Sequence, residues 1–250
     1  MKYLAIIQAR MGSSRLPGKV LKKIGEKTAL ELLLDRVSLS RRIDDIIVAT
    51  TIDKGDLAIV RKVSELGYNI FVGSENDVLD RYYQAARLYE PEYVIRLTAD
   101  NPLLDWRVLD GGIDMLKGET EYLGMLSETF PEGEIIEIVR FDALEYMWKN
   151  AKLASEREHV TLYIKNHRES FNVQDYSCKL GNLYDERWTM DGEDDLEMIR
   201  KVYDFFSPRI DFSLEEIYEF LKEHPDIRKI NRKHKRNEGL YISLKNDKMI

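Results

Sequence analysis

Cysteine is almost absent from this chain, because Cys178 is the only one among 250 residues. A lone thiol excludes an internal disulfide and a cysteine-rich zinc site, and it is typical of a reducing cytoplasm. Long apolar runs are absent as well: the longest one near the N-terminus, Leu4 to Ile7, is interrupted by Gln8 and Arg10. We therefore expect no signal peptide, no membrane span and a cytoplasmic protein.

The chain also lacks an excess of positive charge. It has 38 basic and 45 acidic residues, a formal net charge of −7 and a pI near 5.3. This balance disfavours a general binder of nucleic acid or of anionic membranes, although a local basic pocket for a small phosphorylated ligand is compatible with it. With 44% hydrophobic and 33% charged residues, the composition predicts one globular domain over residues 1–250.

Short apolar runs alternate with amphipathic ones over the first hundred residues. The runs predicted as strands are Tyr3–Ile7, Asp45–Thr50, Asn69–Val72 and Glu92–Thr98. The segments predicted as helices from their apolar spacing are Ala29–Val37, Asp56–Leu66 and Asn76–Tyr89. This alternation predicts an α/β fold whose sheet is mostly parallel and flanked by helices on both faces.

The alternation loosens after about residue 121. The predicted strands there are Tyr122–Leu126, Glu134–Val139, Phe171–Gln174 and Arg187–Met190. The predicted helices are Asp142–Asn150, Glu156–Asn166, Asp194–Phe206 and Leu214–Glu223. We interpret about 121–190 as a segment with a smaller sheet inserted between an N-terminal half, 1–120, and C-terminal helices with a basic tail, 191–250.

The strongest local signal is the loop that follows the first predicted strand. Its sequence is Gln8-Ala9-Arg10-Met11-Gly12-Ser13-Ser14-Arg15-Leu16-Pro17-Gly18-Lys19. The loop lies at the carboxyl edge of the sheet, where open α/β folds bind ligands. Its glycines allow close backbone approach, and Arg10, Arg15 and Lys19 can meet phosphate oxygens. It is not a Walker loop, because Val20 follows the lysine. We favour triphosphate binding over a solvated basic turn.

Five ordered motifs carry a resemblance to a known family. They are Ile6–Leu21 (IIQARMGSSRLPGKVL), Gly73–Tyr82 (GSENDVLDRY), Arg96–Leu103 (RLTADNPL), Glu156–Thr161 (EREHVT) and Trp188–Asp191 (WTMD). Together they resemble the cytidylyltransferases that activate 3-deoxy-manno-octulosonate and acylneuraminates. The resemblance is closer to the branch called spore coat polysaccharide biosynthesis protein F, and it spans about residues 2 to 205.

This resemblance implies a Rossmann-like nucleotidyltransferase that transfers CMP from CTP to a small acidic sugar for surface polysaccharide or glycan biosynthesis, with release of pyrophosphate. The implied nucleotide-binding residues are Gln8, Ala9, Arg10, Gly12, Ser13, Ser14, Arg15, Lys19, Ser74 and Asp80. Arg10, Arg15, Lys19 and Asp100 would be catalytic. Ser74 could equally cap the helix predicted from Asn76. Residues 1–120 would bind the nucleotide, and about 121–190 would serve the acceptor and a homodimer.

Two aspartates are candidate ligands for Mg²⁺. Asp100 follows a predicted strand at the same sheet edge as the loop, where a carboxylate can hold a metal that bridges phosphate oxygens. The resemblance gives this role to Asp100 and Asp191. Taken alone, either residue would also suit a helix cap. We favour the magnesium site because the two aspartates come as a pair. No residue in the sequence stands out as a general base.

Residues that would bind the acceptor sugar are also expected. The resemblance points to Glu137, Arg157 and His159, and an arginine suits a carboxylated sugar. From spacing alone, an exposed helix with local ion pairs around Arg157 and Thr161 is the better interpretation. Relatives usually show G-L-D-V-E where this chain has Gly133 to Glu137, so that Ile136 replaces the aspartate. This departure bears on the acceptor sugar more than on the nucleotide.

The basic run Arg228–Arg236 (RKINRKHKR) stands out in an acidic chain. We interpret it as a solvated or oligomer-contacting tail rather than as a specific anion site. Two rival functions are a glycosyltransferase of a related fold and a non-catalytic protein that binds nucleotide sugars. The first commonly holds its metal with D-x-D, which this sequence lacks. The second would not release pyrophosphate from CTP.

Overall fold

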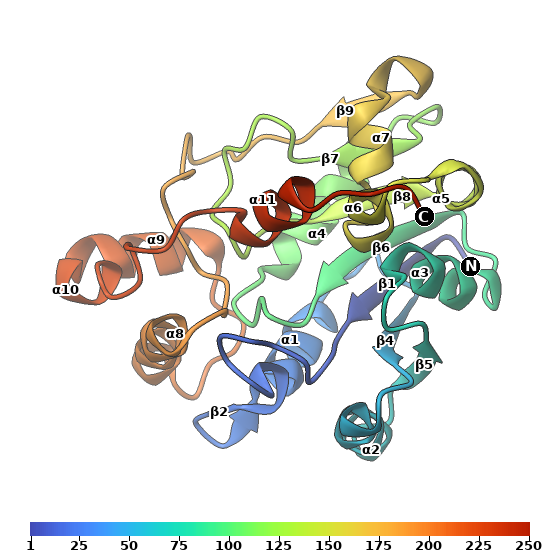
Figure 1. The fold of residues 1–250 in the computed structure, drawn as a ribbon. Coiled ribbons are helices and arrows are strands. Elements are labelled where there is room, and N and C mark those ends of the chain that lie inside the picture. Colours follow the sequence, from blue (N-terminus) through green and yellow to red (C-terminus); the bar gives the residue numbers. More distant parts are fainter.

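The computed structural model describes residues 1–250 and centres on a seven-stranded sheet of order β5-β4-β1-β6-β8-β7-β9 (Figure 1). The strands are β1 (Tyr3–Gln8), β4 (Asp45–Thr51), β5 (Asn69–Gly73), β6 (Tyr93–Thr98), β7 (Tyr122–Gly124), β8 (Glu137–Arg140) and β9 (Val173–Asp175). The first four are mutually parallel, and β8 runs antiparallel to both β6 and β7. A small antiparallel sheet joins β2 (Lys23–Ile24) to β3 (Lys27–Thr28).

Helices cover both faces of this sheet. The helices are α1 (Ala29–Val37), α2 (Leu57–Glu65), α3 (Val78–Arg87), α4 (Trp106–Met115), α5 (Phe141–Asn150), α6 (Ala154–Glu158), α7 (Leu162–Asn166), α8 (Glu193–Phe206), α9 (Leu214–Glu223), α10 (Pro225–Arg228) and α11 (Glu238–Lys245). Three short 3₁₀ turns lie at η1 (Lys19–Leu21), η2 (Lys54–Asp56) and η3 (Arg168–Ser170). No helix is both long and apolar enough to cross a membrane. The predicted α/β fold class is confirmed.

The core consists of two apolar layers separated by the sheet. Successive side chains of a strand point to opposite faces, so β1 sends Ala5 and Ile7 to one layer and Leu4 and Ile6 to the other. The larger layer contains 45 buried residues and includes α1, α8 and α9, whereas the smaller contains 18 and includes α3 and α5. The sheet edge that carries the candidate residues is therefore rigid.

Two predicted elements are wrong, and both errors concern the site. The single helix predicted over Glu156–Asn166 is broken into α6 and α7 at Val160, whose φ is 54°. The strand predicted over Arg187–Met190 is irregular chain, in which only Arg187 makes a bridge, with Glu132. Backbone hydrogen bonds to loops replace the sheet ladder there, as in the 2.8 Å bond from Met190 N to Asp100 O. The helices α4, α10 and α11 were not predicted.

The basic run is solvated only in part: the side chain of Lys233 is 71% exposed, but other residues of the run pack on the fold. Arg228 and Arg232 both pair with the buried Glu186, and Asn231 is itself buried. Arg236 donates to the backbone carbonyls of Phe130 and Tyr184 at 2.9 and 3.0 Å. These contacts fasten the start of a C-terminal strap, residues 229–250, which crosses from α10 towards α6 (Figure 1).

A substitution of Gly133 would test how closely its backbone packs against the irregular segment that contains Trp188 and Thr189. Its φ is +114°, and an added Cβ would lie 2.6 Å from the backbone N of Thr189 and from the carbonyl carbon of Trp188. We expect Gly133→Ala to lower the free energy of unfolding by about 2 kcal/mol or more. Urea denaturation measures this loss, with Gly118→Ala as the control because Gly118 has open space around it. Equal midpoints for both variants would contradict the expectation.

Candidate active site

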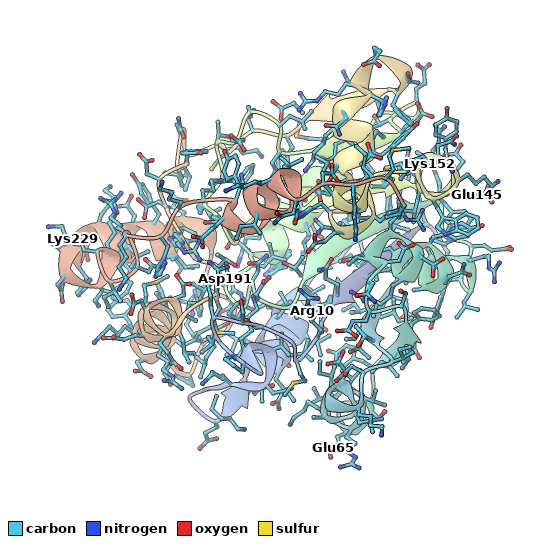
Figure 2. The ribbon with its side chains drawn as sticks, viewed as in Figure 1. Arg10, Glu65, Glu145, Lys152, Asp191 and Lys229 are labelled. Atoms are coloured by element: carbon cyan, nitrogen blue, oxygen red, sulfur yellow. The ribbon has the colours of Figure 1, made fainter.

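Two adjoining cavities open at the carboxyl ends of β1 and β6. Their volumes are about 550 and 290 Å³, and we call them the first and the second cavity. The residues that line both are Thr98, Asp100, Glu132, His159, Asp191 and Asn237. All eight loop residues predicted to bind the nucleotide line the first cavity: Gln8, Ala9, Arg10, Gly12, Ser13, Ser14, Arg15 and Lys19. In Figure 2, Arg10 and Asp191 lie near the middle of the molecule, whereas Glu65 and Lys229 lie at its periphery.

The loop after β1 is held by backbone hydrogen bonds at Met11 and Gly18. Gly18 adopts a left-handed conformation with φ 67°, and its N–H donates to Met11 O at 3.0 Å. The N–H of Met11 donates in turn to the buried carboxylate of Asp56 at 2.7 Å. That carboxylate also accepts from the hydroxyl of Thr51 at the end of β4. The neighbouring strand thus fixes the loop and directs Lys19 into the first cavity.

Lys19 lies between the two candidate metal carboxylates. Its Nζ is 2.6 Å from Asp100 Oδ2 and 2.7 Å from Asp191 Oδ1, and its side chain is only 13% exposed. Burial favours the neutral amine, but the two carboxylates outweigh burial and raise the pKa of Lys19 above its usual value. Burial likewise opposes ionisation of Asp191, yet Lys19 and the arginines Arg15 and Arg187 hold the pKa of Asp191 below its usual range.

Each carboxylate is oriented by its own neighbours. The hydroxyl of Thr98 donates to Asp100 Oδ1 at 2.6 Å, and Arg187 Nη2 lies 3.1 Å from Asp191 Oδ2. The buried Asp195 accepts from the backbone N–H of Asp191 at 2.9 Å. Neither candidate is a helix cap, because Asp105 caps α4 and α8 begins after Gly192. The capping alternative is therefore wrong for both aspartates.

These carboxylates suit a magnesium ion. They converge on one cation, and they come from separate elements at the mouth of a cavity rich in phosphate-binding donors. No cluster of three or more acidic, histidine or cysteine side chains exists that could hold a metal by itself. Mg²⁺ usually takes one or two carboxylates and completes its shell with waters and substrate phosphates. The pair Asp100 and Asp191 matches this coordination preference.

Further cations line the first cavity from three directions. Arg10 projects from the loop, and Arg15 contacts both Asp191, at 3.1 Å, and Glu238 of α11. Arg81 of α3 also lines the cavity, although the sequence analysis gave it no role. Its Nη1 donates to Ser74 O at 2.6 Å, while its buried Nε has no partner. Arg81 belongs to the GSENDVLDRY motif, which was the available signal.

Glu137 anchors the wall of the second cavity. Its carboxylate accepts from the hydroxyls of Tyr122 and Thr161, at 2.5 and 2.6 Å, and pairs with Lys165 and Arg96, at 2.7 and 2.6 Å. Burial opposes ionisation, but the two cations together hold the pKa of Glu137 well below its usual range. With four donors already bound, this carboxylate positions its neighbours rather than offering an acceptor site.

Hydrogen-bonding nitrogens without a partner remain on the side chains around Glu137. Arg96 keeps a buried Nε without a partner, and so does His159 at Nε2. Burial lowers the pKa of His159, with Arg96 and Lys165 acting in the same direction against Glu158. His159, Arg96 and Lys165 all line the second cavity. Neither Arg96 nor Lys165 was predicted as a site residue: Arg96 begins the RLTADNPL motif, which was the available signal, whereas Lys165 lies outside the five motifs.

Three predicted site residues lie outside both cavities. Arg157 donates from Nε and Nη2 to Asp77, the N-cap of α3, so that it joins α6 to α3. Ser74 accepts from the N–H of Asp77 at 3.1 Å. Asp80 accepts from the indole N–H of Trp148 at 2.8 Å. The structure thus places Arg157, Ser74 and Asp80 in local packing roles and does not bring them to the site.

Ile136, which stands where the G-L-D-V-E motif has its aspartate, lies in an apolar environment. Its side chain is fully buried and packs against Gly112 of α4, where an added Cβ would come 2.7 Å from Ile136 Cδ1. A carboxylate at this position would be buried in the larger apolar layer.

Comparisons with known proteins agree with this geometry. A family model described as cytidylyltransferase matches residues 4–238. An uncharacterized protein of Methanocaldococcus jannaschii is 41% identical over 92% of this chain and 95% of its own length. A spore coat polysaccharide biosynthesis protein of Bacillus subtilis is 35% identical over 89% and 95%. The solved structure of a cytidylyltransferase from Leptospira borgpetersenii has a TM-score of 0.87 at 33% identity, covering 91% of this chain and 97% of that one.

The ion pairs of Glu137 predict a pH-dependent contribution to stability. Glu137→Gln leaves Lys165 and Arg96 without their shared carboxylate, so we expect a loss of roughly 3 kcal/mol in the free energy of unfolding at pH 7. Folding favours the ionised form of Glu137. The contribution is therefore complete above the usual carboxyl pKa and is lost as the pH falls towards the lower folded value.

Urea unfolding of both proteins at pH 7 and near pH 3 measures this difference, which should shrink at the lower pH. Glu145→Gln serves as the control, because Glu145 is a surface residue paired with Lys149. A difference that is unchanged or larger in acid would contradict the assignment.

Proposed function

The chain belongs to the cytidylyltransferase family, and from that premise we propose that it transfers CMP from CTP to a small acidic sugar and releases pyrophosphate. The observation that carries the proposal is the convergence of Lys19 on Asp100 and Asp191 beside the cationic loop. Such a site can receive a triphosphate together with its magnesium ion. An acceptor hydroxyl would attack the α-phosphate in line, and pyrophosphate would leave.

This reaction depends on positioning and charge neutralisation rather than on a covalent nucleophile. Arg10, Arg15 and Lys19 would bind the outer phosphates and stabilise the charge that develops on pyrophosphate. Asp100 and Asp191 would hold Mg²⁺. The ion, when bound, would neutralise phosphate charge. Asp195 and Arg187 would keep Asp191 in place while the ligands exchange.

The second cavity would hold the acceptor. Arg96, Lys165 and His159 offer donors on one wall, which supports an acceptor that carries a carboxylate. Glu137 would position Arg96 and Lys165 instead of contacting the sugar. Arg157 is not part of this proposal. The name of the Bacillus subtilis relative, a spore coat polysaccharide biosynthesis protein, supports a role in surface polysaccharide synthesis. The homodimer implied by the resemblance stays a prediction.

A screen of the four nucleoside triphosphates against acidic and neutral sugars, with pyrophosphate release as the readout, tests the proposal. We expect release only with CTP, an acidic sugar and magnesium together. A glycosyltransferase would consume a nucleotide sugar and release no pyrophosphate, and a binding protein would release none from any mixture.

Asp100→Asn and Asp191→Asn test the magnesium site. Each removes one anionic ligand and keeps the side-chain shape, so magnesium-dependent turnover should fall by orders of magnitude while the melting temperature moves little. The double variant should be no worse than either single one, because residues that act as a unit are strongly non-additive.

The matched control is Asp114→Asn, an exposed aspartate that pairs with Arg42 at 2.6 Å and lines neither cavity. A magnesium titration of pyrophosphate release compares the four proteins with the wild type. Near-normal turnover in either single variant would remove that aspartate from the site.

A further inference from the structure

The C-terminal strap crosses the mouth of the first cavity. Asn237, Glu238, Gly239 and Ile242 line that cavity, and Leu240 lines the second one. The match to the family model ends at residue 238, so almost all of α11 lies beyond the matched segment. In Figure 1, α11 runs between α10 and α6. The strap thus closes over the candidate site.

α11 is fastened at its ends and exposed between them, where the hydroxyl of Ser243 donates to Glu158 of α6 at 2.7 Å. At its start, Asn237 N–H donates to Glu132 at 3.0 Å. After its end, Asp247 accepts from the hydroxyl of Ser155 at 2.6 Å, and Ile250 N–H donates to Lys152 O at 2.9 Å. The helix itself buries none of its residues, in contrast to α8 and α9. A segment with few buried contacts between fixed ends can shift at low cost.

One ion pair connects α11 to the phosphate-binding loop. Glu238 Oε2 contacts Arg15 Nη1, and the two side chains are 45% and 40% exposed. Arg15 is also one of the three cations assigned above to the outer phosphates. Glu238 takes the Nη1 side of Arg15 and Asp191 the Nη2 side, so an outer phosphate that approaches Arg15 from the Nη1 side competes with the Glu238 carboxylate for space and for the charge of the guanidinium.

We propose that Glu238 is a gate residue that responds to the outer phosphates: its carboxylate holds α11 on Arg15, and only a ligand whose outer phosphates reach Arg15 displaces it. The inference rests on the proposed function for its ligand. CMP, whose single phosphate corresponds to the α position, does not reach Arg15 and leaves the gate in place. Binding of CTP therefore releases α11 before any acceptor binds, at a cost in CTP affinity, whereas binding of a monophosphate does not.

The test is a thermodynamic cycle on Arg15 and Glu238, measured by calorimetry with CTP, pyrophosphate and CMP. Glu238→Gln removes the competing charge, so it should tighten CTP and pyrophosphate by about two- to fivefold, the range for a partly exposed ion pair. CMP affinity should not change. In an Arg15→Gln background the same substitution should have no effect on any of the three ligands.

Glu223→Gln is the matched control, because it removes the same charge from the end of α9 and lines neither cavity. The proposal is overturned if Glu238→Gln leaves CTP affinity unchanged or weakens it. It is also overturned if CMP tightens equally, or if the tightening persists without Arg15. A protein that shows the expected pattern yet releases no pyrophosphate with any sugar would refute the proposed function and keep the gate.

Discussion

The contact of Lys19 with Asp100 and Asp191 is the interaction on which the site depends. The three side chains come from the loop after β1, the end of β6 and the segment before α8. Two carboxylates this close to each other would repel without a cation between them. The ammonium group therefore permits a geometry that is needed only when ligands bind, because its charge offsets the repulsion between the two carboxylates.

Other cations that line the two cavities are paired with carboxylates in the same way. Three cations suited to a charged ligand already have internal partners of the opposite sign: Lys19 has two aspartates, Arg15 has Asp191 and Glu238, and Arg96 has Glu137. These pairs hold the side chains in place before binding, so a ligand meets oriented donors instead of flexible ones. The cost is that a ligand must compete with the internal partner, which weakens the binding of that ligand.

Sequence reasoning recovered the parts of the site that follow from local pattern. The strand and loop over residues 3–19 were predicted because a buried run precedes glycines and cations. The position of Asp100 followed from the end of β6, and the resemblance supplied Asp191. Arg157 could not be placed in the same way, because its partner Asp77 lies 80 residues away on α3. The left-handed Val160, which ends α6, has no signature among β-branched residues.

The segment from Arg187 to Asp191 shows why the spacing of the two candidate metal carboxylates could not be predicted from the sequence. Its apolar and polar residues alternate as in a strand, yet its only β-type pairing is the isolated bridge of Arg187 with Glu132. Its backbone instead bonds to loops, and the bond from Met190 N to Asp100 O brings the chain beside the end of β6. Asp191 follows directly, so a pairing of two irregular segments sets the spacing of the two carboxylates. Periodicity can predict each segment's burial, but this register depends on tertiary contacts alone.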